Sequence, residues 1–165
     1  MDVQDAIFSR RTIKDFKPDA VPAPLIEEIL TAGTWAQNHK LTEPWRFIVL
    51  GPKAHQAIAA IDGKLATKPL VVAVACHLNG DAFQQREDYA AVCCAIQNIQ
   101  LAAWAHGLGM QWSTGRTSQL PETRALLQID QAREEMIGLL YIGYPASLPK
   151  PQPRKPVAEV TRWLD

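Results

Sequence analysis

The sequence has 165 residues, a mass of 18.3 kDa and equal numbers of basic and acidic residues, 17 of each. Apolar residues form 47% of the chain and charged residues 21%, which excludes a disordered or collagen-like protein. The balanced charge argues against a broad basic surface for nucleic-acid phosphate. A chain of this size is expected to form one domain, over residues 1–165, that buries about 70% of its unfolded surface without metals or disulfides.

The elements predicted from hydrophobic spacing and from proline and glycine positions follow one another closely in the first half of the chain. In chain order they are a helix over 2–10, a helix after Pro22, a polar loop over 37–44, a strand over 45–50, a helix from Pro52 to about residue 61, and a strand over 69–78. The strand over 69–78 is β-branched and continuously apolar, so we expect both of its faces to be buried.

The second half begins with the longest apolar stretch and ends in a proline-rich tail. The predicted elements are a long helix through 89–105, a helix C-cap at Gly107, a strand over 110–114, a helix over 121–127, a strand over 136–144, and a tail from Pro145 with further prolines at 149, 151, 153 and 156. The tail should run extended across a surface such as that of a partner chain. The elements together predict the α+β or α/β class, with a central sheet flanked by helices.

The stretch over 89–105 is too short and too polar for a membrane span, because Gln97, Asn98 and Gln100 interrupt it. A helix that is apolar nearly all round belongs at the centre of a fold or at a seam between two copies. The amino terminus lacks the long apolar segment of a secretory signal. Three cysteines with neither CxxC nor zinc spacing indicate buried thiols, so we expect a cytoplasmic protein.

The common single-chain catalytic motifs are missing from the sequence. It contains no GxxxxGK[ST], HExxH or GxSxG, and no pair of histidines at ligand spacing on one helical face. The glycines of residues 107–109 resemble the start of a dinucleotide-binding motif, but a third glycine is missing and a helix precedes them. An enzyme of this sequence would therefore rely on a bound organic cofactor.

Three polar clusters stand out against the apolar background. Residues 9–16 place three cations beside hydroxyl groups, which suits a phosphate, although a solvated helix end has the same composition. Residues 37–45 crowd donors and acceptors into a short loop, which can also be an ordinary polar loop. Residues 112–116 lie at the end of a predicted strand, where small residues let a ligand approach or simply form a turn.

The order of these clusters resembles the nitroreductase family, and most closely its small FMN-dependent NAD(P)H nitroreductases. The matching segments are RRTIKDF over 10–16, NHKLTEPWRF over 38–47, WSTG over 112–115 and RKPVAEV over 154–160. The resemblance spans nearly the whole chain. It implies a nitroreductase-like central mixed sheet and an obligate homodimer with FMN at the subunit interface. The long apolar helix would then lie at the dimer interface.

The resemblance also implies cofactor-binding positions near the two ends of the chain. Arg10, Arg11 and Thr12 match positions that bind FMN, chiefly through its phosphate and ribityl groups. Lys14 matches a basic position near the flavin, and Arg154 would return to the phosphate.

Further implied cofactor contacts come from the middle of the chain. His39 and Glu43 match a loop that contacts FMN, and Trp112, Ser113 and Thr114 match a contact strand. Relatives often carry glutamine where Glu43 stands, and a carboxylate can only accept hydrogen bonds. The chain also lacks an inserted helical segment that often covers the substrate in the family.

The implied activity is transfer of hydride from NADH or NADPH through flavin N5 to an electron-poor acceptor such as a nitroaromatic or a quinone, in a ping-pong cycle. FMN would carry this chemistry, so we expect neither a catalytic side chain nor a metal. Three alternatives stay open: another flavin chemistry of the family, such as reductive dehalogenation or flavin fragmentation; an FMN-binding carrier or sensor without turnover; and an interaction domain without a cofactor.

Overall fold

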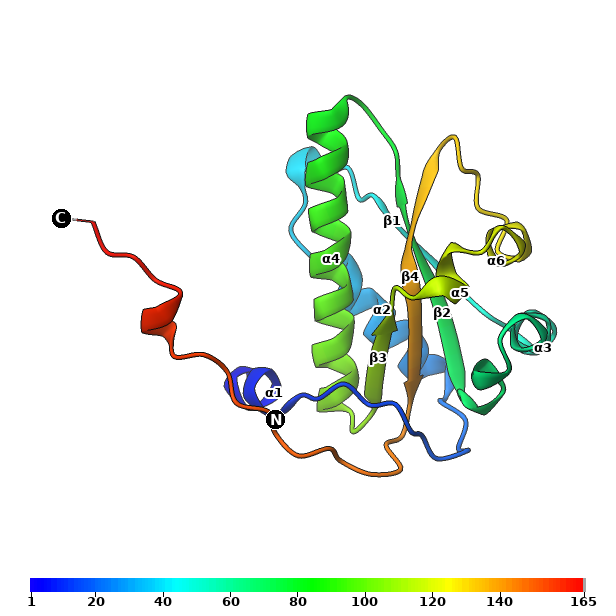
Figure 1. Ribbon diagram of the computed structural model, residues 1–165, viewed down its shortest axis with the longest axis horizontal. Helices are drawn as coiled ribbons and strands as arrows, with labels where there is room; N and C mark the ends of the chain where they lie inside the picture. The colour runs from blue at the N-terminus through cyan, green and yellow to red at the C-terminus, as the bar shows by residue number, and fades with distance from the viewer. Residues whose placement is uncertain (165) are drawn as a thin grey trace.

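One antiparallel sheet organises the computed structural model, which describes residues 1–164 (Figure 1). Its strands lie in the order β1-β2-β4-β3, with the bounds β1 Trp45–Val49, β2 Leu70–His77, β3 Gly109–Ser113 and β4 Glu134–Gly143. The helices are α1 Val3–Ser9, α2 Ala23–Thr34, α3 Pro52–Ile61, α4 Ala82–Ala105, α5 Arg116–Gln119 and α6 Pro121–Leu126, with 3-10 turns at His39–Leu41, Gly63–Thr67 and Val157–Glu159. The predicted class, a central sheet flanked by helices, is confirmed.

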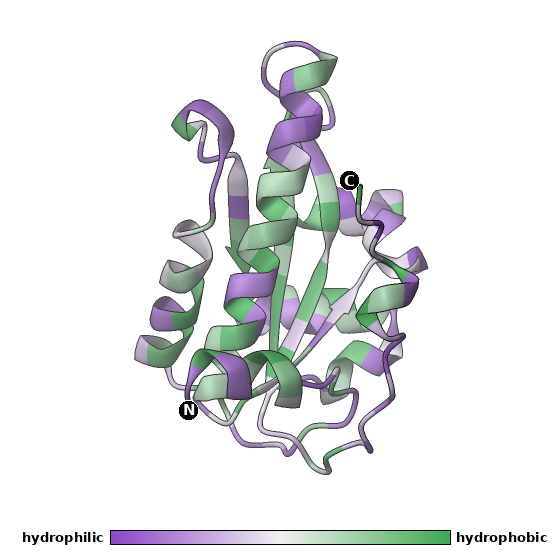
Figure 2. Cartoon of the chain, turned by 90° about the vertical axis from the view of Figure 1, so that its left-hand side faces the viewer, coloured by the Kyte–Doolittle hydropathy of each residue, from purple (hydrophilic) through white to green (hydrophobic). Residues whose placement is uncertain are grey.

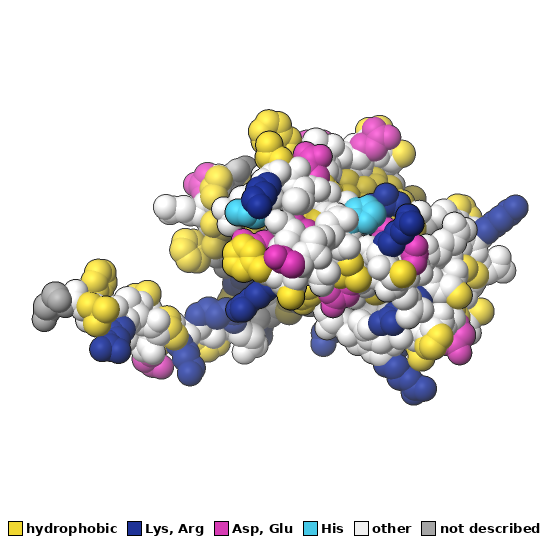
Figure 3. All heavy atoms as spheres, turned by 90° about the horizontal axis from the view of Figure 1, so that it is seen from above, with side chains coloured by type: hydrophobic (Ala, Val, Ile, Leu, Met, Phe, Trp, Pro, Cys, Tyr) yellow, Lys and Arg dark blue, Asp and Glu magenta, His cyan; other side chains and the backbone are white. Residues whose placement is uncertain are grey.

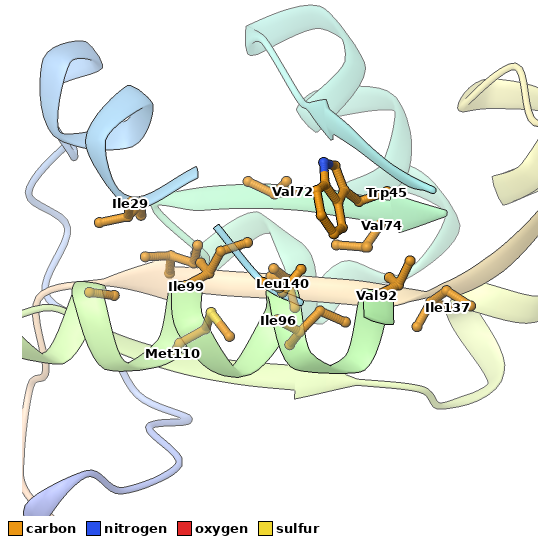
Figure 4. Close-up of a cluster of buried hydrophobic side chains, with 14 of the residues drawn as sticks. Ile29, Trp45, Val72, Val74, Val92, Ile96, Ile99, Met110, Ile137 and Leu140 are labelled. Atoms are coloured by element: carbon orange, nitrogen blue, oxygen red, sulfur yellow. The ribbon is translucent and has the colours of Figure 1, made fainter. Parts of the chain in front are cut away.

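The two faces of the sheet bury two separate apolar clusters. Alternate residues of β2 point to opposite faces, so Val72 and Val74 join the cluster under α2 and α4, whereas Val71 and Ala73 join the one under α3. Figure 4 shows the first cluster, in which Ile96 and Ile99 of α4 pack with Leu140 of β4. The prediction that the strand over 69–78 is buried on both faces is confirmed. Strands buried on both faces are usual in parallel sheets. Here β2 is buried on both faces within an antiparallel sheet, because helices cover both sides of the sheet.

Helix α4 begins earlier than the apolar pattern predicts. The side chain of Asp81 accepts a hydrogen bond from the backbone N–H of Gln84 and caps a helix that starts at residue 82 rather than 89. At the other end Gly107 adopts a positive φ of 74°, as the predicted C-cap requires. No helix within residues 1–164 is long and apolar enough to cross a membrane.

One side of α4 packs on the sheet and the opposite side is uncovered in the single chain. Val92 and Ala103 are fully buried, whereas Tyr89, Ala90 and Gln97 are exposed. Figure 2 shows that the middle turns of this outward side are largely hydrophobic. The helix is therefore central to the fold and also presents an unpartnered surface.

The strands pair only antiparallel with one another, and parallel pairing is confined to an isolated bridge between Thr12 and Met110. A second bridge joins Phe16 to Pro145, after which the tail leaves the body of the protein. Residues 146–164 are exposed, and the tail projects away from the sheet (Figure 1), with basic and apolar side chains along it (Figure 3). The tail is extended apart from the turn at Val157–Glu159, but in the single chain residues 146–164 do not lie across a surface, contrary to what the sequence predicts.

Candidate functional site

Residues 10–14, here called the arginine arm, run beside β3 and are fixed to it by the main chain. The N–H of Ile13 donates to the carbonyl of Met110 at 3.1 Å, next to the bridge at Thr12. The side chain of Ile13 is buried against Gly109, where an added Cβ would lie 2.6 Å from Ile13 Cβ. The close approach of strand and arm therefore requires glycine at residue 109.

Three guanidinium groups gather at the start of this arm. Burial lowers the pKa of Arg10, and the positive charges of Arg11 and Arg154 lower it further. Within residues 1–164, none of the three arginines pairs with a carboxylate. Because like charges so placed repel one another, the cluster favours an anion that would neutralise it. The charge of Arg154 therefore acts on Arg10 of the arginine arm, across more than 140 residues of sequence.

The Arg11 side chain also caps the C-terminus of a helix. Its Nη1 donates to the carbonyls of Phe8 and Arg10, both at 2.8 Å, at the C-terminus of α1. This is the helix-end interaction that the sequence left open as an alternative. Arg11 therefore keeps only part of its donor capacity for a ligand.

Thr12 and Lys14 of the arm are exposed. The carbonyl oxygen of Lys14 accepts a hydrogen bond from Lys68 Nζ at 2.7 Å. That ammonium also lies 5.4 Å from the ring centre of Phe16 and 5.8 Å from that of Tyr141. Lys68, which sequence reasoning missed, therefore ties the arm to the sheet while leaving the Lys14 side chain free in solvent.

Residues 38–43, here called the left-handed loop, carry His39 and Glu43. Positive φ angles of 55°, 53° and 45° occur at Lys40, Leu41 and Glu43, a conformation that costs a non-glycine residue about 1 kcal/mol or more. The side-chain oxygen of Asn38 accepts from the N–H of Glu43 at 2.9 Å and closes the loop. Such a concentration of strained residues indicates a conformation that other contacts impose.

A pocket of about 280 Å³ lies between this loop and α4. Its lining residues are Gln37, Asn38, His39, Glu87, Ala90, Ala91 and Cys94. The imidazole ring of His39 also stands edge-on to Phe83, with 6.3 Å between ring centres. Within the described chain, no group of three or more histidine, cysteine, aspartate or glutamate residues could hold a metal.

The third predicted segment ends β3. The indole of Trp112 lies over Gly138 of β4, where a Cβ would approach Trp112 Nε1 to 2.6 Å and the Ser113 carbonyl to 2.8 Å. Ser113 is half-buried and Thr114 exposed. Beyond the bridge at Met110, the outer edge of β3 has no strand partner among residues 1–164.

The single chain brings some of the predicted residues together and separates others. The arginine arm, Arg154 and β3 are neighbours near the C-terminal end of α4, where Trp104 Nε1 donates to Ser9 Oγ at 2.7 Å. The left-handed loop contacts the N-terminal half of the same helix at Asp88. Asp88 and Trp104 are 16 positions apart along the helix, which corresponds to about 24 Å. His39 and Glu43 therefore lie far from the arginine arm of their own chain.

The central sheet flanked by helices and the segments along it match a known protein family. The family model of the Nitroreductase family matches residues 7–78 and 59–144, so the chain belongs to this family. A Bacillus subtilis (strain 168) protein with the provisional name NAD(P)H nitroreductase YfhC is 30% identical, over 95% of this chain and 91% of that protein.

Solved structures show the same similarity. A nitroreductase-like family protein from Bacillus cereus superposes with a TM-score of 0.90 at 28% identity, over 100% of this chain and 97% of the other. A protein from Desulfovibrio desulfuricans, provisionally called a nitroreductase and solved in complex with FMN, has a TM-score of 0.83 at 26% identity, over 100% and 98% of the two chains.

Proposed function

We propose that this protein is an FMN-dependent oxidoreductase that uses NADH or NADPH to reduce an electron-poor acceptor such as a nitroaromatic or a quinone. Support comes from its membership of the family, from the NAD(P)H nitroreductase names of its relatives and from the FMN complex of the Desulfovibrio protein. The proposal includes a cytoplasmic location, in keeping with three free cysteines.

The arginine cluster is the observation that carries the proposal. The charges of Arg11 and Arg154 act on Arg10, and within residues 1–164 no carboxylate pairs with any of the three, so a dianion bound between them would relieve their repulsion. Guanidinium groups match phosphate oxygens two at a time. The exposed hydroxyl of Thr12 adds a neutral donor on the same arm. These residues fit the terminal phosphate of FMN.

The remaining predicted residues would orient the ring system. Trp112 and Ser113 end β3 and Thr114 follows them, at the edge of the sheet along which the arm runs. Lys14 would place a positive charge near the ring and so favour its reduced, more negative form. FMN supplies the chemistry when bound, by taking hydride from a nicotinamide and passing electrons to the acceptor. The chain itself needs only to bind, orient and shield the reactants.

A complete site requires the left-handed loop, and we propose that a second copy of the chain supplies it. The distance of about 24 Å along α4 keeps His39 and Glu43 from the arginine arm of their own chain. The outward side of α4 is uncovered. A two-fold axis across this side would bring the loop of one copy to the arm of the other. The site would then lie at the interface of a homodimer.

The exposed area of the chain supports the same assembly. A compact monomer of 18.3 kDa exposes about 8,000 Å², whereas this chain exposes 10,434 Å². Part of the excess lies in the tail, where Val157, Val160 and Trp163 are more than two-thirds exposed. Apolar side chains so exposed are expected to cover a partner.

The visible spectrum of the purified protein tests the proposal. We expect a yellow dimer with one FMN per chain that loses its colour when NADH or NADPH is added without oxygen. A colourless monomer that does not bind added FMN would refute the proposal. A protein that binds FMN but is not bleached by either nucleotide would refute the enzymatic part and favour the carrier or sensor.

A further inference from the structure

Asp88 is a buried acidic residue outside the predicted set. It is 0% exposed on α4, and its Oδ1 accepts hydrogen bonds from Thr42 Oγ1 at 2.6 Å and from Gln84 Nε2 at 2.9 Å. Its Oδ2 is buried without a hydrogen-bond partner within residues 1–164, and no cation of that range pairs with the carboxylate. A carboxylate buried in this way is costly, so its bonds must serve a purpose that an apolar residue would not.

The bond to Thr42 reaches across 46 residues of sequence to the left-handed loop. Thr42 itself has helical angles, but Lys40 and Leu41 before it and Glu43 after it have positive φ. Residues in this conformation revert to ordinary angles unless neighbouring contacts hold them. Within the described chain, the side-chain hydrogen bond that ties the loop to a secondary-structure element is the one from Thr42 to Asp88.

The position of Asp88 connects the loop to the pocket. Its neighbours Glu87 and Ala91 on α4 line the pocket, together with His39 of the loop. Asp88 therefore fixes the spacing between the helix side and the loop side of the same cavity. A change in its bond to Thr42 would move His39 on one side of that residue and Glu43 on the other.

We propose that Asp88 is a positioning residue that holds the left-handed loop, through Thr42, in the conformation that presents His39 and Glu43 to the ligand. The reference to a ligand rests on the proposed function. The restraint on the loop does not, and the experiment measures the two parts separately.

Hydrogen exchange of the Thr42 and Glu43 amides tests the restraint, on the full chain without FMN. Loss of a charge-assisted hydrogen bond in Asp88→Ala or Thr42→Val should speed exchange roughly ten- to hundredfold. Because both changes remove the same bond, the double variant should exchange no faster than the faster single variant. Thr31→Val is the matched control, since that hydroxyl donates only to the Glu27 carbonyl within α2.

Exchange unchanged in Thr42→Val would overturn the proposal, and this variant decides the matter even if Asp88→Ala does not fold. Asp88→Asn keeps an acceptor for Thr42, so it should restore slow exchange where alanine does not. Fast exchange in Asp88→Asn would also count against the proposal, provided that this variant melts at the same temperature as the original protein.

Measurements of ligand binding and turnover then test whether Asp88 positions the loop for the ligand or only supports the fold. At saturating FMN, Thr42→Val should raise the acceptor KM about tenfold and leave kcat within about twofold, with Asp88→Asn close to the original protein. A fast-exchanging loop with unaltered KM and FMN affinity would refute a positioning role. If the unmodified chain binds no FMN, the proposed function fails, and the exchange result still decides whether Asp88 holds the loop.

Discussion

The arginine arm and the left-handed loop both carry predicted ligand-binding residues, but different contacts hold them. The arm is attached through its main chain to β3 and through a buried isoleucine to the core. The loop depends on a hydrogen bond that the Asn38 side chain accepts and one that the Thr42 side chain donates, and it has strained backbone angles. The position of the arm should therefore survive changes to its exposed side chains, whereas the loop should be sensitive to single substitutions.

Removing the buried side chain that anchors the arm should have the largest effect. Ile13→Ala should lower the free energy of unfolding by about 2–5 kcal/mol, because it leaves a cavity against β3. Urea unfolding measures this loss. Ile7→Ala, at a half-exposed position of α1, is the control and should change stability by less than about 1 kcal/mol. A loss at residue 13 no larger than at residue 7 would show that the arm is not anchored through its side chain.

A second substitution tests the phosphate-binding role of the arm without moving the arm. Arg10→Ala should weaken FMN binding by about 1.5–3 kcal/mol, or roughly ten- to hundredfold, and leave unfolding nearly unchanged. Titration of apoprotein with FMN gives the affinity. The exposed Lys17 offers a matched control outside the cluster, as Lys17→Ala. Equal affinities for the two variants would remove the phosphate role from Arg10.

A smaller effect is expected at Lys14, whose side chain is exposed while its carbonyl is held by Lys68. Lys14→Met should keep the arm in place and shift the flavin reduction potential to a more negative value by about 10–20 mV. Redox titration with a reference dye resolves such a shift. An unmoved potential would contradict the electrostatic role of Lys14.

Thiol reactivity should differ between the core and the loop region. Burial raises the pKa of Cys76 to about 12, so this thiol stays protonated and unreactive toward iodoacetamide at pH 8, whereas the pocket residue Cys94 should react. The unfolded thiol ionises near pH 9. Because the pKa of Cys76 is higher in the folded state, its ionisation leaves stability unchanged below pH 9 and lowers it as the pH rises from 9 toward 12. Mass spectrometry of labelled peptides would reveal an unexpected modification of Cys76.

Much of the fold could be predicted from local patterns. Apolar runs and proline positions located the strands and most helices, because these signals depend on residues close in sequence. The first two turns of α4 were missed because their polar residues hide the helix that Asp81 caps. The short helix α5 was also missed.

The candidate site could be predicted only in part. Arg10, Arg11 and Arg154 were expected to share a ligand, which stays a prediction, although the charges of Arg11 and Arg154 do act on Arg10. Asp88 and Lys68 act through partners 46 and 54 residues away, and no local pattern reveals such contacts. The positive φ angles of Lys40 and Leu41 were equally hidden, because neither residue type favours that conformation.

The burial of β2 on both faces has a consequence for how the proposed activity would be lost on warming. Amides of Val72 and Val74 should exchange only when the whole molecule unfolds, whereas the loop can open locally at much lower cost. Catalytic turnover would then fade at temperatures where far-ultraviolet circular dichroism is still native. Inactivation and melting would occur as two separate events.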